Sequence, residues 1–109
     1  EFDGVIVPGG YAPDFLRRSK AMLALVSEMN DKGKLVAMIC HAGWVGISAG
    51  IVKGRTLTST ATIKDDMSNA GAIWVDQSVV VDRNLVTSRS PADLPDFMRE
   101  VLRVLSAQK

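Results

Sequence analysis

The chain has one cysteine and one histidine, and they are neighbours at the end of an apolar run. Residues 36–50 read VAMICHAGWVGISAG, so Cys40 closes the run, His41 follows and small residues come next. A thiol beside an imidazole can act as a nucleophile with its own base, because the imidazole can accept the thiol proton. The alternative is that Cys40 is a small buried hydrophobic residue, which is the commoner role of a free cysteine.

The predicted elements place Cys40 between the end of a strand and the start of a helix. The apolar residues 35–39 predict a buried strand, and residues 41–49 predict a short helix that ends at Gly50. Ligands of open α/β sheets bind beyond the carboxyl ends of the strands, which is where Cys40 falls. The positive end of the following helix favours the thiolate form. For His41 two roles stay open: a neutral base, or an exposed residue that does not touch the sulfur, because adjacent side chains on a sharp turn point apart.

A second loop is predicted at the same edge of the sheet. Residues 2–7 are mostly apolar and β-branched, which predicts a buried strand, and Pro8, Gly9 and Gly10 end it. Glycines let the backbone approach a substrate closely, so the amides of Gly9 and Gly10, with that of His41, could form an oxyanion hole. A plain turn is the alternative.

The remaining elements define the class. Ser19 can cap a helix over 21–30 that Gly33 ends, and its apolar residues repeat every three or four positions. Strand, helix, strand over residues 2–39 is a βαβ unit, which implies a parallel sheet covered by helices. Further expected elements are a strand at 57–59, a helix at 63–70, a strand at 73–75, a hairpin of 78–81 with 85–87, and a final amphipathic helix at 91–106. The class is therefore α/β, with a mostly parallel sheet and an appended antiparallel hairpin.

Composition narrows the function. The 109 residues suit a single domain, and a net charge of +1 with scattered basic residues predicts no nucleic-acid partner and no membrane attachment. One cysteine allows no intrachain disulfide, and the lack of a Cys/His cluster predicts no metal site, so a reducing cytoplasm is expected. The chain opens inside a predicted core strand. We therefore expect residues 1–109 to be the later part of a longer domain that also has earlier strand and helix elements.

Four segments carry a family resemblance. VIVPGG with the following AP and LR, ICHAGWVGISAGIVKGRTLTS, IKDDMSNAGAIWVDQSVVVD and LVTSRSPADLPDFMRE resemble, in register, the ThiJ/PfpI family of the class I glutamine-amidotransferase-like superfamily. The resemblance implies a flavodoxin-like three-layer sandwich with Cys40 as a reactive nucleophile followed by His41. It implies no cofactor, and homodimers or hexamers. It also brings a loop containing Arg89 and Pro91 close to the site, where Arg89 could bind an anion or form a structural salt bridge.

The chain departs from the family pattern at its acidic residues. The family's usual glutamate partner of the cysteine lies near the end of an earlier strand, and no residue of this sequence matches it. Members regarded as proteases place a further glutamate from a neighbouring subunit against the histidine. Its expected position here is at Arg18, Ser19 and Lys20, where no carboxylate stands. A peptidase needs a stabilised imidazolium to expel an amine, whereas thiolate addition to an aldehyde does not.

These observations favour a cytoplasmic stress-protection enzyme, a cysteine-nucleophile hydrolase or lyase of deglycase or glyoxalase type. Its substrates would be small reactive carbonyls or glycated protein. The alternatives are an intracellular cysteine peptidase that takes peptide substrates, and a redox sensor or holdase chaperone without turnover. The acidic pair Asp65 and Asp66 is expected on an exposed helix, and Trp44 and Trp74 in the core or an interface rather than against a substrate.

Overall fold

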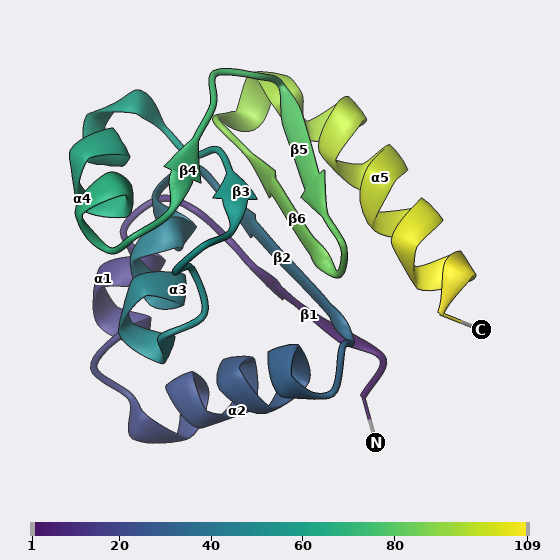
Figure 1. The fold of residues 1–109 in the computed structure, drawn as a ribbon, viewed down its shortest axis with the longest axis horizontal. Helices are drawn as coiled ribbons and strands as arrows, with labels where there is room; N and C mark the ends of the chain where they lie inside the picture. The colour runs from purple at the N-terminus through teal and green to yellow at the C-terminus, as the bar shows by residue number, and fades with distance from the viewer. Residues whose placement is uncertain (1, 109) are drawn as a thin grey trace.

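Strand β2 (Leu35–Ile39) is buried along its whole length, as its uninterrupted apolar run predicts. The computed structural model describes residues 2–108. In it β2 lies between two parallel neighbours, β1 (Gly4–Val7) and β6 (Leu85–Ser88), and β5 (Val79–Asp82) pairs antiparallel with β6. The sheet order is β1-β2-β6-β5, with β1 and β5 at its edges (Figure 1). The prediction of a mostly parallel sheet with a hairpin is therefore confirmed.

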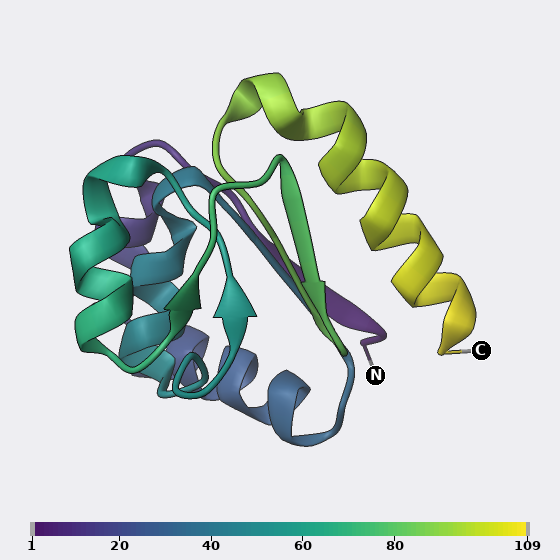
Figure 2. The ribbon, with the colours of Figure 1, turned by 45° about the horizontal axis from the view of Figure 1, so that its top comes forward.

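Helices cover both faces of this sheet. On one face lie α2 (Lys20–Asp31), α3 (Gly43–Ala49) and α4 (Lys64–Asn69), while α5 (Leu94–Ala107) covers the other face (Figures 1 and 2). Two clusters of buried apolar side chains fill the spaces between these layers. The Ser19 hydroxyl accepts a hydrogen bond from the Met22 N–H at 3.2 Å, so the predicted cap of α2 is present. This is the layer arrangement of an α/β sandwich.

Shorter elements connect these layers. Helix α1 (Ala12–Leu16) follows the glycine loop, and single 3-10 turns precede α3, α4 and α5. Strands β3 (Thr56–Leu57) and β4 (Ile73–Trp74) form a small parallel sheet of their own. The sequence does not predict this pairing, because each strand has only two residues and their partners are distant in the chain. No helix among residues 2–108 is both long and apolar enough to cross a membrane.

Two predicted apolar faces are only half buried. The strand predicted over residues 2–7 begins at Gly4 and lies at the sheet edge, so Ile6 is 46% exposed and only Val7 is buried. On α5 the stripe divides: Phe97 and Val101 are buried against the sheet, while Leu94 and Leu102 are exposed. The predicted burial of the strand is too high, because a sequence pattern marks an apolar segment but not how much of it another element covers. For the last helix the sequence predicts an apolar face, and that face is present but only partly covered.

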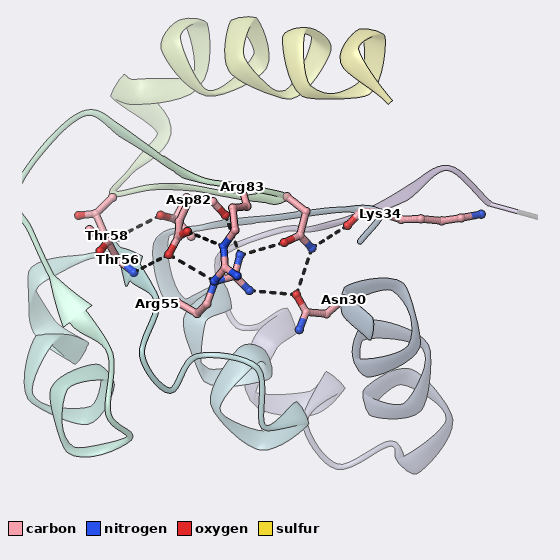
Figure 3. A network of polar contacts seen from close by, with 9 residues as sticks. Asn30, Lys34, Arg55, Thr56, Thr58, Asp82 and Arg83 are labelled. Atoms are coloured by element: carbon pink, nitrogen blue, oxygen red, sulfur yellow. Dashed lines mark hydrogen bonds and ion pairs between the residues drawn. The ribbon is translucent and has the colours of Figure 1, made fainter. Parts of the chain in front are cut away.

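A buried polar network joins the elements at the amino-terminal edge of the parallel strands (Figure 3). The Arg55 guanidinium donates to the Asp82 carboxylate at 3.3 Å, to the Asp82 carbonyl at 2.7 Å, to Asn84 Oδ1 at 2.9 Å and to Asn30 Oδ1 at 3.0 Å. Asn84 in turn donates to the Lys34 carbonyl at 2.8 Å. Arg55 is only 7% exposed, and such a buried charge is tolerable because carboxylate and amide oxygens surround it. The network ties α2, the start of β3 and the β5–β6 hairpin together.

Candidate active site

Cys40 occupies a strained turn directly after β2. Its φ is +62°, a left-handed conformation that residues with a side chain seldom adopt. The Thr60 N–H donates to the Cys40 carbonyl at 3.2 Å and helps to hold the turn. A Cβ at Gly9 would lie 2.8 Å from the Cys40 Cβ, so the glycine loop can approach this closely only because it lacks a side chain. Such strain is typical of functional sites, where the rest of the fold enforces it.

The His41 ring lies against the sulfur. Its Nδ1 is 3.3 Å from Cys40 Sγ, and its Nε2 is 3.3 Å from Thr62 Oγ1. The expectation that adjacent side chains on a sharp turn point apart is therefore wrong here. The left-handed Cys40 backbone changes the relative direction of the two side chains, and the 3-10 turn Cys40–Ala42 follows at once. The contact allows the thiol proton to pass to Nδ1.

A pocket of about 580 Å³ opens over this pair. Cys40 and His41 form part of its wall, together with Gly10, Tyr11, Asp14, Trp44 and Pro91. Cys40 is half-buried, so the sulfur is neither sealed in the core nor fully in solvent. A small carbonyl compound or one modified side chain fits a cavity of this size.

The other predicted site residues divide into two groups. Gly10, with φ +70°, and Pro91 line the pocket, and Gly9 packs behind the cysteine. Arg89 instead binds carboxylates: its Nε is 2.9 Å from Asp93 and its Nη1 is 2.8 Å from Asp76. The hydrogen bond to Asp93 raises the pKa of Arg89. The same bond lowers the pKa of Asp93. The structure thus contains the salt-bridge alternative for Arg89, and its anion-binding role stays a prediction.

Three residues around His41 are not predicted by the sequence. Asp14 is an exposed carboxylate of α1 that lines the pocket. It belongs to this chain, so the expectation that a neighbouring subunit offers no carboxylate at Arg18, Ser19 and Lys20 stays a prediction. Thr62 contacts His41 from the turn before α4. Trp44, expected in the core or an interface, lines the pocket. The only sequence signal for Asp14 is its position soon after the glycine loop.

The remaining candidates Asp65, Asp66 and Trp74 do not line the pocket. Asp65 and Asp66 lie exposed in the first turn of α4. Trp74 packs against the core and donates to Ser59 Oγ at 3.0 Å. Among residues 2–108 no group of three or more His, Cys, Asp or Glu side chains could hold a metal ion.

Comparison with known proteins places this arrangement in a family. Residues 1–104 match the DJ-1/PfpI family. The chain belongs to the DJ-1/PfpI family. It is 48% identical over 105 residues to Deglycase PfpI of Pyrococcus furiosus, covering 96% of this chain and 63% of that protein. It is 47% identical over 108 residues to Protein/nucleic acid deglycase 2 of Escherichia coli, covering 98% of this chain and 63% of the relative. The chain therefore spans somewhat less than two thirds of these DJ-1/PfpI proteins.

Solved structures of the DJ-1/PfpI family share its fold. A two-domain protein of Anabaena variabilis, with DJ-1/ThiJ/PfpI-like and ferritin-like domains, superposes with a TM-score of 0.95 at 44% identity, covering 97% of this chain and 30% of that one. DJ-1beta of Drosophila melanogaster gives a TM-score of 0.86 at 32% identity, covering 98% of this chain and 56% of that one. The predicted flavodoxin-like fold and the family resemblance are both confirmed.

Proposed function

We propose that Cys40 is the nucleophile of a deglycase- or glyoxalase-type enzyme. Its substrates would be reactive carbonyls such as methylglyoxal, or early glycation adducts on protein. One observation carries the proposal: a cysteine at φ +62° after a central strand has its sulfur 3.3 Å from an imidazole nitrogen at the wall of a pocket. The relatives of Pyrococcus furiosus and Escherichia coli that are named deglycases support it.

The chemistry begins with a proton transfer from the Cys40 thiol to His41 Nδ1. The thiolate then forms a bond to the aldehyde carbon, and the π electrons of the carbonyl move onto its oxygen. Backbone N–H groups of Gly10 and His41, with Gly9 shaping the loop, would stabilise that oxyanion. The imidazolium returns the proton and leaves a hemithioacetal. This step expels no leaving group, so it makes a modest demand on the imidazolium.

A cysteine peptidase is the second candidate, and Asp14 favours it. A peptidase must protonate an amine as it leaves, which requires an oriented and stabilised imidazolium. A carboxylate in the same pocket as His41 could provide that stabilisation. Such a carboxylate of the same chain would offset the lack of one at Arg18, Ser19 and Lys20. The names of the relatives keep carbonyl chemistry first.

Partners and location follow from the same proposal. We propose a homo-oligomer, because several large apolar side chains are exposed, including Tyr11 at 88% and Phe15 at 64%. We propose a cytoplasmic location because the one cysteine is free. Sedimentation of the full-length protein tests it, and a monodisperse monomer would contradict it. The substrates remain small carbonyls or glycated chains, without nucleic-acid or membrane partners.

The deciding experiment compares three substrates on one preparation of the full-length protein: methylglyoxal, a methylglyoxal-modified peptide and an unmodified casein-type peptide. We expect carbonyl turnover that Cys40→Ala lowers by at least about a thousandfold, because the covalent step is lost. Cys40→Ser is the isosteric control and should be nearly as inactive, since a serine hydroxyl is a poorer nucleophile here. Cleavage of the unmodified peptide alone would favour the peptidase. Absence of all turnover, with Cys40 oxidised by peroxide, would favour a redox sensor.

A further inference from the structure

Trp44 lies against the His41 ring and is itself held from two sides. The centroids of the two rings are 5.1 Å apart with an interplanar angle of 52°. The indole Nε1–H donates to the Asp66 carboxylate at 2.9 Å. The Arg17 guanidinium lies 5.6 Å from the centroid of the Trp44 ring, and its Nε donates to Ser48 Oγ at 2.9 Å. Contacts from the end of α1, from α3 and from α4 thus hold one indole in place.

The polar contacts of His41 do not by themselves explain its orientation. Both its contacts, to Cys40 Sγ and to Thr62 Oγ1, measure 3.3 Å. The contact to Thr62 is longer than a strong hydrogen bond, and sulfur is a weak partner. The Trp44 ring is a third neighbour of the imidazole, within contact distance of its ring. Tilted contacts between aromatic rings are favourable in addition to the area they bury, because the edge of one ring meets the face of the other.

We propose that Trp44 is a positioning residue for His41, and that the Asp66 carboxylate anchors it from α4. In this arrangement the indole holds the imidazole with Nδ1 toward the sulfur. The inference builds on the proposed cysteine chemistry, but its structural part concerns only the His41 ring. It assigns a role to Asp66, which the acidic pair in the sequence does not suggest. Trp44 also lines the pocket, so the alternative role is direct contact with the substrate.

The test uses the fact that His41 is the only histidine among the 109 residues. The two ring C–H signals that disappear in His41→Ala identify this ring in the NMR spectrum of the protein, and the neighbouring indole shifts them by its ring current. The variants are Trp44→Leu, which removes the ring, and Trp44→Phe, which keeps an aromatic face. Asp66→Ala removes the acceptor of the indole N–H, and Asp66→Asn restores one. Trp74→Phe is the matched control, because Trp74 does not line the pocket.

We expect Trp44→Leu to move the His41 signals to positions typical of an unshielded ring and to lower kcat roughly tenfold, because the base is misplaced. KM should change by less than about threefold, since binding is retained. Trp44→Phe and Asp66→Asn should keep the His41 signals and kcat close to their wild-type values. Asp66→Ala should change both, but by less than Trp44→Leu does. Trp74→Phe should change neither.

Two results would overturn the proposal. The first is unchanged His41 signals in Trp44→Leu. The second is a raised KM with kcat unchanged, which would make Trp44 a substrate wall. If Trp44→Leu fails to fold, the His41 signals and kcat of Asp66→Ala, compared with those of Trp44→Phe, test the proposal instead. A wild-type protein without any carbonyl turnover would refute the proposed function, while the NMR measurement would still decide whether Trp44 orients His41.

Discussion

The two edges of the parallel sheet treat polar groups in opposite ways. At the amino-terminal edge, Arg55 is 7% exposed and its guanidinium satisfies four oxygen acceptors. At the carboxyl edge, the Cys40 backbone is strained at φ +62°, and His41 has only two polar contacts, one to sulfur and one to the Thr62 hydroxyl, at 3.3 Å each. The carboxyl edge also has a structural ion pair, Arg89 with the buried Asp93, but its Cys40 and His41 side chains are only half-buried and line a pocket. The Arg55 network and the Cys40–His41 pair therefore lie at opposite ends of the parallel strands.

The separation makes a clear prediction for Arg55. Arg55→Leu removes the donor of four hydrogen bonds, while the Asp82 carboxylate keeps Arg83 and the Thr56 N–H. It should lower the free energy of unfolding by about 3 kcal/mol, because buried oxygen acceptors lose their partner. Urea denaturation measures the loss. Carbonyl turnover per folded molecule should stay at the wild-type value. Arg55→Lys is the matched control and should recover only part of the stability, since an ammonium lacks the planar fork that reaches several oxygens. A large loss of activity in fully folded Arg55→Leu would show that the two edges are coupled.

His41→Ala should have the reverse profile. Removing the imidazole takes away the proton acceptor beside the sulfur and should lower kcat by one to two orders of magnitude, roughly 10- to 100-fold. The urea midpoint should hardly change, because the ring is half-exposed and its two polar contacts are weak. Thr62→Val, which removes only the contact to Nε2, should give a smaller loss of kcat. Equal losses of kcat in His41→Ala and Thr62→Val would mean that the Thr62 contact, which fixes the His41 tautomer, matters as much as the imidazole itself.

Gly9→Ala tests how tightly the carboxyl edge is built. The added Cβ would lie 2.8 Å from Cys40 Cβ, so the glycine loop and the cysteine must move apart. We expect kcat to fall on the order of tenfold, because small displacements of a nucleophile are costly. Gly33→Ala is the control: it lies away from the pocket, at φ +69° with open space around it, and should lose only about 1 kcal/mol of stability. Wild-type activity in Gly9→Ala would show that the site tolerates this movement.

Substitution of Asp93 should have the smallest effect on stability, and this effect should depend on pH. Its hydrogen bond from Arg89 lowers the pKa of the folded carboxyl, and the pKa of the unfolded one is about 4. The unfolded chain therefore binds a proton at a higher pH than the folded chain does. Asp93 thus contributes stability above about pH 4, and this contribution disappears as the pH falls through the lower folded pKa.

Asp93→Asn should consequently lower the melting temperature at pH 7 and converge on the wild type as the solution is acidified. Thermal melts of both proteins between about pH 7 and about pH 2.5 measure the difference. Other carboxyls with lowered pKa, such as Asp82 and Glu100, titrate in both proteins and cancel in the comparison. A difference that stays constant across this range would show that the Arg89–Asp93 pair does not depend on the charge of Asp93.

Local features were predictable from the sequence alone. The buried run of β2, the Ser19 cap and the left-handed glycine at Gly33 depend on neighbouring residues only, so their patterns were sufficient. The same holds for Cys40 at the end of a strand, because the next few residues decide where the strand stops. The DJ-1/PfpI membership also followed from motifs in register along the chain.

Tertiary structure alone decided what surrounds Cys40 and how the far edge is held. Asp14 and Thr62 reach the His41 site from α1 and from the turn before α4, and they lie 27 and 21 residues from His41 in the chain. Arg55 likewise meets Asn30 and Asp82 across separations of 25 and 27 residues. The half-exposed faces of β1 and α5 belong here too, since burial depends on which other elements pack there. Periodicity reports the conformation of a segment, whereas a site and its support depend on contacts between segments that are far apart in the chain.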